Sequence, residues 1–162
     1  MEKLEKINKI DLVEKKKIID GILYAVIAII FNQENKVLMF LRKGEKWEQG
    51  WEPIKGAIHF GESEEEAVLR EIQEEAGLKN VRIIGKLPDF YWGEKPWKNG
   101  KLKIKSRVFI CKYLGGEITL GESEHIGYKW MDVKEAKEKI WLTQKGRKNL
   151  IEEAFKFYLK AS

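Results

Sequence analysis

The stretch that decides the fold is residues 56–78, which read GAIHFGESEEEAVLREIQEEAGL. Its second half predicts an amphipathic helix, because apolar residues recur at helical spacing and would pack on a sheet. This apolar stripe consists of Val68, Leu69, Ile72 and Ala76. Ser63 and Glu66 form a capping box at the start of the helix, and Gly77 supplies a left-handed stop at its end.

Three carboxylates share one side of this predicted helix. Glu71, Glu74 and Glu75 stand at positions i, i+3 and i+4. Like charges so placed repel one another unless a cation or an arginine neutralises them. A site made only of oxygen ligands favours a hard cation, Mg²⁺ or Mn²⁺, over Zn²⁺. The acidic side lies about 120° from the apolar stripe, so the glutamates are expected at the edge of a cleft.

The fixed positions of this stretch resemble the signature of the Nudix hydrolases. The matching residues are Gly56, Glu62, Arg70, Glu71, Ile72, Glu74, Glu75, Gly77 and Leu78. The resemblance implies a metal-dependent pyrophosphohydrolase, a phosphoric anhydride hydrolase that cleaves a nucleoside diphosphate linked to another group. It implies Mg²⁺ as the cofactor, with Mn²⁺ as the other choice, and a nucleotide with a phosphate chain as the bound partner.

The same resemblance assigns roles to single residues. It implies metal ligation by Glu71, Glu74, Glu75 and the main-chain carbonyl of Gly56. Arg70 would hold the glutamates through ion pairs, and Glu62 would belong to the same scaffold without ligating metal. A further carboxylate is expected from the loop before the last strand, where Glu122 and Glu124 are both available and Glu124 is preferred. The predicted catalytic set is therefore Arg70, Glu74, Glu75 and Glu124.

Two motifs outside the signature resemble the asymmetric diadenosine tetraphosphate hydrolases, one branch of the family. They are Trp51-x-Pro53-x-Lys55-Gly56 and Glu124-His125-x-x-Tyr128-x-Trp130. Lys55 would place a cation beside the phosphate chain, and Tyr128 would stack on a base. The chain departs from that branch after Gly56, where Ala57 replaces a frequent histidine and His59 follows two residues later.

Several alternatives stay open from the sequence. The same chemistry would serve a nucleoside triphosphate, ADP-ribose or the 5′ end of RNA, because the signature does not set the leaving group. A non-catalytic nucleotide-sensing module is a third reading, against which the intact glutamates argue. Trp51 and Trp130 are favoured as core residues. Tyr91, Trp92 and Trp97 lie in a predicted loop at 88–100 and require burial, a base or a partner subunit.

The whole chain of 162 residues predicts one domain, with a charged N-terminal extension at 1–20 and the hydrolase domain at 21–162. Alternating strands and helices predict an α/β fold, a Nudix-type α/β/α sandwich with a central mixed sheet. The expected strands are 21–32, 36–42, 81–87, 102–114 and 128–131, with a further short one considered at 117–120. The expected closing helices are 133–140 and 144–159.

Composition adds weaker indications. No run is long or apolar enough to span a bilayer, and the N-terminus lacks the apolar region of a secretory signal. The single cysteine, Cys111, is expected in a buried strand, which suits a reducing cytoplasm. A net charge of +5 helps to attract polyanionic substrates, but the signs are interspersed, so no stable nucleic-acid partner is expected. The sequence leaves open whether the protein forms a homodimer.

Overall fold

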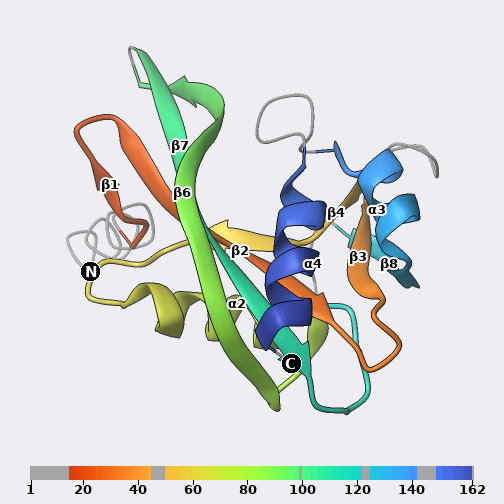
Figure 1. The fold of residues 1–162 in the computed structure, drawn as a ribbon. Coiled ribbons are helices and arrows are strands. Elements are labelled where there is room, and N and C mark those ends of the chain that lie inside the picture. The colour runs from red at the N-terminus through yellow and green to blue at the C-terminus, as the bar shows by residue number, and fades with distance from the viewer. Residues whose placement is uncertain (1–14, 45–49, 99, 122–124, 142–148, 162) are drawn as a thin grey trace.

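A mixed sheet with helices on both faces forms the centre of the molecule (Figure 1). The computed structural model describes residues 15–44, 50–98, 100–121, 125–141 and 149–161. The strands are β1 (Ile18–Ile19), β2 (Ile22–Phe31), β3 (Val37–Arg42), β4 (Trp51–Glu52), β5 (Ile54–Ala57), β6 (Val81–Trp97), β7 (Gly100–Tyr113) and β8 (His125–Met131). The helices are α2 (Glu64–Ala76), α3 (Val133–Lys139) and α4 (Leu150–Ala161). The predicted α/β sandwich is therefore confirmed.

Strand β2 is the centre of the sheet because its sequence, ILYAVIAIIF, is apolar on both faces. It pairs in parallel with β7 over its whole length, and antiparallel with β5 through residues 25–28. Alternate side chains of β2 pack into two separate hydrophobic cores, one on each face of the sheet. Ile27 and Ile29 belong to the core under α3 and α4, whereas Val26 and Ala28 belong to the core under α2. All of these side chains are at most 1% exposed.

Helix α2 begins and ends as the sequence predicts. The Ser63 side chain accepts a hydrogen bond from the Glu66 amide at 3.0 Å, and the Glu66 carboxylate accepts one from the Ser63 amide at 3.1 Å. Gly77 adopts a left-handed φ of 69°. The apolar stripe needs one correction: Leu69 is exposed, and Ala67 takes its place in the core. Since successive residues are turned by about 100°, Leu69 lies past the edge of the buried face.

The prediction of a loop at 88–100 is wrong. Strand β6 continues to Trp97 and pairs with β7 up to the turn between Trp97 and Gly100. This stretch contains Pro88 and Pro96, which cannot donate to a sheet ladder. They are tolerated here because β6 is an edge strand of the sheet and carries irregular pairing between Leu87 and Phe90. Figure 1 shows the resulting β6–β7 ribbon extending well past the helices.

The remaining differences are two short strands that the sequence did not predict, β4 and β5, and the ends of several elements. Residues 117–120 are not a strand; the Thr119 amide instead donates to the Ala76 carbonyl and completes the end of α2. At the N-terminus, β1 joins the sheet as a short hairpin with β2, while 1–14 lie outside the described residues. The predicted helix at 144–159 is described from Leu150 to Ala161. No helix in the described ranges has the length and apolarity needed to cross a membrane.

Candidate active site

Helix α2 and strand β5 meet at Gly56. A side chain at this position would collide with the Glu71 carboxylate, because its Cβ would lie 2.0 Å from Glu71 Cδ. A larger residue at this position would therefore displace the Glu71 carboxylate from its present place beside β5. The pairing of Val26 with Gly56 fixes β5 at this position against the central strand. The main chain of Gly56 is thereby held against Glu71.

Arg70 ties the acidic residues together. Its guanidinium donates two hydrogen bonds to Glu62, at 2.7 and 3.0 Å, and one to Glu71 at 2.7 Å. It also contacts Glu74 at 3.3 Å and donates to the Ala57 carbonyl at 2.8 Å. The hydrogen bond to Glu62 raises the pKa of Arg70 further above its ordinary value, and the same bond lowers the pKa of Glu62. Arg70 is thus a structural cation within the acidic group.

Glu71 is a buried carboxylate that has Arg70 as its cationic partner and two further glutamates nearby. Burial raises the pKa of Glu71 to about 6, although the hydrogen bond from Arg70 opposes that rise. The residue is 8% exposed and faces the backbone of Gly56. A carboxylate in this environment gains stability from a further cation beside it. The donor set of carboxylates and a nearby main-chain carbonyl suits Mg²⁺ or Mn²⁺.

The sequence reasoning missed Glu52, which lies 1% exposed on β4. His125 on β8 connects it to α2: His125 Nε2 lies 2.9 Å from Glu52 Oε1, and Nδ1 lies 3.2 Å from Glu75 Oε2. Burial lowers the pKa of His125, but the hydrogen bonds to Glu52 and Glu75 outweigh it and raise the pKa to about 9. The imidazole is therefore cationic at neutral pH and links two carboxylates.

Gly56, His125 and four glutamates line one cavity of about 540 Å³. Its acidic wall consists of Glu52, Glu71, Glu74 and Glu75. Three lysines also line it, Lys16 before β1, Lys55 on β5 and Lys95 on β6. Lys55 Nζ lies 3.5 Å from Glu52 Oε2, which places this predicted phosphate-binding cation at the cavity wall. A cavity lined by both carboxylates and ammonium groups can hold a cation together with a polyanion.

The glutamates of α2 are not arranged as a ready-made metal cluster. Within the described ranges, no three acidic, histidine or cysteine side chains converge in the way that a metal ion requires. Glu71 is turned toward Arg70, and Glu75 toward His125. The residues nevertheless suit a divalent cation, because they supply oxygen ligands from one helix beside Gly56. Metal binding would therefore require the glutamate side chains of α2 to turn toward a common point.

Tyr128 lies close to this cavity without lining it. The side chain is 43% exposed on β8, and its ring centroid lies 6.4 Å from that of Phe40. A register shift in the pairing of β3 with β8 places Tyr128 opposite Phe40 and His125 opposite Arg42. Since residues 40 and 42 face the same side of β3, Tyr128 and His125 share that side. The tyrosine is thus available to a ligand that extends from the cavity.

The other predicted site residues have different positions. Glu122 and Glu124 lie outside the described residues. Trp51 is 1% exposed and is a core residue, as the sequence favours. Trp130 is partly buried against the ring of Tyr113, with centroids 5.0 Å apart. The His59 amide donates to Glu62 at 3.0 Å, so this segment supports the scaffold around Arg70.

Comparison with known proteins agrees with this geometry. The family profile described as NUDIX domain matches residues 22–154. An ADP-ribose pyrophosphatase of Methanocaldococcus jannaschii is 33% identical over 93 residues, which are 57% of this chain and 53% of that protein. The chain thus aligns with only about half the length of that relative. An RNA pyrophosphohydrolase of Wolbachia pipientis wMel is 30% identical over 137 residues, covering 80% of this chain and 77% of that protein.

A solved Ap4A hydrolase from C. elegans has the same fold. It superposes with a TM-score of 0.59 at 22% sequence identity, covering 85% of this chain and 99% of that chain. An identity this low establishes the shared architecture alone. The relatives therefore agree on pyrophosphatase chemistry, while their names cover different substrates.

Proposed function

Because this chain belongs to the NUDIX domain family and is a Nudix hydrolase, we propose that it cleaves dinucleoside polyphosphates. The specific reaction is asymmetric hydrolysis of diadenosine tetraphosphate to ATP and AMP. The observation that carries this proposal is the cavity in which the carboxylates of α2 meet the lysines of β5 and β6. Such a cavity suits a substrate whose reacting part is a chain of phosphates.

The metal would be held by Glu71, Glu74, Glu75 and the main-chain carbonyl of Gly56. When bound, Mg²⁺ or Mn²⁺ neutralises charge on the phosphate oxygens and lowers the pKa of water. The burial of Glu71 supports this assignment, since burial and the neighbouring Glu74 and Glu75 raise its pKa despite the hydrogen bond from Arg70.

The protein residues around the metal have separate proposed roles. Lys55 binds the phosphate chain, and its contact with Glu52 keeps the ammonium group at the cavity wall. Glu74 and Glu75 are the proposed catalytic carboxylates on α2, and Glu124 is the proposed one from the loop before β8. Arg70 positions them, because its guanidinium already contacts Glu71 and Glu74. His125 holds Glu75 from the opposite side.

Tyr128 is the proposed contact for one base of the substrate. Its half-exposed ring, on the same side of the sheet as His125, supports this role. Stacking on an aromatic ring tolerates any base, so the residue would favour a nucleotide without fixing which one. Together with Lys55, it accounts for the preference for a dinucleoside polyphosphate over a simple pyrophosphate.

Hydrolysis of RNA 5′ ends is the second candidate. The observation in its favour is the 30% identity to an RNA pyrophosphohydrolase over 80% of this chain. Both candidates use the same acidic cavity and the same metal. They differ in what is attached to the far side of the phosphate chain.

Chromatographic identification of products tests the proposal. The purified protein, supplied with Mg²⁺, should convert diadenosine tetraphosphate to equal amounts of ATP and AMP. A parallel panel contains ATP, ADP-ribose and a 5′-triphosphorylated RNA. Two molecules of ADP from diadenosine tetraphosphate, or a higher kcat/KM for any panel member, would contradict the substrate assignment.

A further inference from the structure

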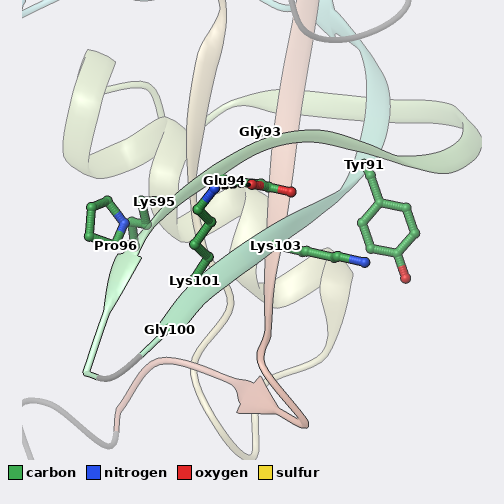
Figure 2. A pocket seen from close by; sticks show the side chains of 8 residues that line it. All are labelled: Tyr91, Gly93, Glu94, Lys95, Pro96, Gly100, Lys101 and Lys103. Atoms are coloured by element: carbon green, nitrogen blue, oxygen red, sulfur yellow. Dashed lines mark ion pairs between the residues drawn. The ribbon is translucent and has the colours of Figure 1, made fainter.

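The β6–β7 ribbon carries a second cavity, which is larger than the acidic one. Its volume is about 870 Å³, compared with about 540 Å³ for the acidic cavity. None of the proposed catalytic residues in the described part of the chain lines it. The lining residues are Tyr91, Gly93, Glu94, Lys95, Pro96, Gly100, Lys101 and Lys103 (Figure 2). A cavity of this size can hold a ligand as large as a nucleotide.

The charge of this ribbon cavity favours an anion. Three of its lining residues are lysines, and Glu94 is the one carboxylate among them. Glu94 is partly neutralised by Lys101, whose Nζ lies 3.7 Å from Glu94 Oε2. Lys103 has no ion pair with another residue in the described ranges. Lysines therefore outnumber carboxylates in this lining, which suits a phosphate group.

Tyr91 adds an aromatic surface to these cations. The residue is 50% exposed, and Lys105 Nζ lies 5.3 Å from its ring centroid. Figure 2 shows Tyr91 and Lys103 extending from the ribbon on the same side. An exposed aromatic ring beside ammonium groups can bind a base by stacking and its phosphate by charge.

Lys95 relates this cavity to the acidic one, because it lines both. It lies on β6, the strand at the end of the sheet order β4-β3-β2-β7-β6. A flexible phosphate chain that starts at the glutamates of α2 can therefore pass Lys95 and cross the edge strand into the ribbon cavity. The two cavities then accommodate two parts of one elongated anion.

We propose that the ribbon cavity binds a second nucleoside 5′-phosphate of the substrate, with its base on Tyr91 and its phosphate beside Lys103, which lies on the same face of the ribbon. This inference rests on the proposed function, since it places the far end of the phosphate chain that the acidic cavity cleaves. Tyr128 then contacts one base and Tyr91 the other. A nucleoside phosphate in this position occurs in a dinucleoside polyphosphate and also at the 5′ end of RNA.

Calorimetric titration with non-hydrolysable ligands tests the inference. The probes are methylene-bridged analogues of diadenosine tetraphosphate and of ATP, measured in the presence of Mg²⁺. Tyr91→Ala should reduce the ratio of the dinucleotide affinity to the ATP-analogue affinity by about tenfold, because one stacked base is lost. Lys103→Ala should reduce the same ratio, and Tyr91→Phe should preserve it because the ring remains.

Lys134→Ala is the matched control, because Lys134 is an exposed lysine on α3, far from the ribbon in Figure 1. An unchanged affinity ratio in Tyr91→Ala and Lys103→Ala, with a native circular dichroism spectrum, would overturn the inference. The analogues are not hydrolysed, so this result does not depend on turnover. Failure of the protein to hydrolyse diadenosine tetraphosphate would instead count against the proposed function.

A 5′-triphosphorylated dinucleotide separates the two sources of the ligand. If its affinity falls in Tyr91→Ala while that of the diadenosine analogue does not, the cavity binds an RNA end, and the assignment to a dinucleoside polyphosphate is overturned. If both affinities fall, the cavity accepts any nucleoside 5′-phosphate attached to the chain. If neither falls, the ribbon takes no part in binding the substrate.

Discussion

At the scale of single residues, Gly56 controls the position of the Glu71 carboxylate. Its missing side chain makes room for the Glu71 carboxylate, and an added Cβ would lie 2.0 Å from Glu71 Cδ. We predict that Gly56→Ala displaces Glu71 and lowers Mg²⁺-dependent kcat by roughly 10- to 100-fold. Steady-state kinetics checks this, with Gly127→Ala as control because nothing lies within 4 Å of a Cβ there. Wild-type kcat in a folded Gly56→Ala variant would contradict this account of Glu71.

Glu75 is the residue whose charge is proposed to matter most to the reaction. The substitution Glu75→Gln keeps the shape of the side chain but removes the charge that would bind the metal. We expect kcat to fall on the order of 100-fold, because stabilisation of the developing phosphate charge is weakened. Glu138→Gln on α3 is the control, since it removes an exposed carboxylate elsewhere. A fully active Glu75→Gln enzyme at saturating Mg²⁺ would remove Glu75 from the mechanism.

Tyr128 is expected to act on binding rather than on chemistry. Tyr128→Ala should raise KM by roughly tenfold with little change in kcat, if stacking contributes equally in the ground and transition states. Tyr128→Phe keeps the ring and should stay close to wild type. Because Tyr128 is 43% exposed, its loss should leave the fold intact, which circular dichroism can verify. An unchanged KM in a folded Tyr128→Ala protein would place the base elsewhere.

Individual site residues were predictable to different degrees. The shared side of the α2 glutamates follows from their spacing, whereas Gly56 and Arg70 were chosen because their segment resembles the family signature; the structure places both beside Glu71. Glu52 was not predictable, because its contact with His125 joins residues 73 positions apart. That contact depends on β4 and β8 both pairing with β3. A carboxylate between a buried tryptophan and a proline was the one local sign that Glu52 is unusual.

At the scale of elements, the capping box decides how firmly α2 holds its acidic side. Ser63 and Glu66 satisfy each other's backbone amides at the helix start. We predict that Ser63→Ala lowers the free energy of unfolding by about 1 kcal/mol, because an amide of the first turn loses its partner. Urea titration measures this, with Ser63→Thr as the control that retains a hydroxyl. Equal stability of wild type and Ser63→Ala would show that the cap contributes nothing.

Elements with local sequence signals were predicted well, including the long apolar strands β2, β3 and β7, whereas the length of β6 was not. The boundaries of α2 follow from Ser63 and Gly77, which act within a few residues of the helix ends. The extension of β6 past Pro88 depends instead on β7, which supplies the partner for an edge strand interrupted by irregular pairing. Tertiary pairing therefore maintains a strand where the sequence predicted a loop. The ribbon cavity was hidden from the sequence for the same reason.

At the scale of the whole molecule, Cys111 reports the integrity of the core. It is fully buried on β7, and burial raises the pKa of its thiol to about 12 from 9.0. The unfolded chain therefore loses the thiol proton at a lower pH than the folded one. This contribution to stability is present below about pH 9 and decreases as the pH rises toward 12.

Two measurements check this prediction for Cys111. The native protein at pH 8 should react with a thiol reagent only as fast as it unfolds, whereas the protein in urea should react at once. Between pH 9 and 10.5, the wild type should lose more stability than Cys111→Ala, which lacks the ionising group. Rapid labelling of the native protein would show that β7 is accessible and that the packing described for the core is wrong.

The central claim for the whole molecule is that the acidic cavity carries out metal-dependent hydrolysis of a phosphate chain. The most direct test is the rate of diadenosine tetraphosphate cleavage as a function of Mg²⁺ concentration, starting from protein treated with a chelator. The account predicts no turnover without a divalent cation, and a saturable recovery when Mg²⁺ or Mn²⁺ is added. Turnover that persists in the chelator, or no cleavage at any Mg²⁺ or Mn²⁺ concentration, would contradict it.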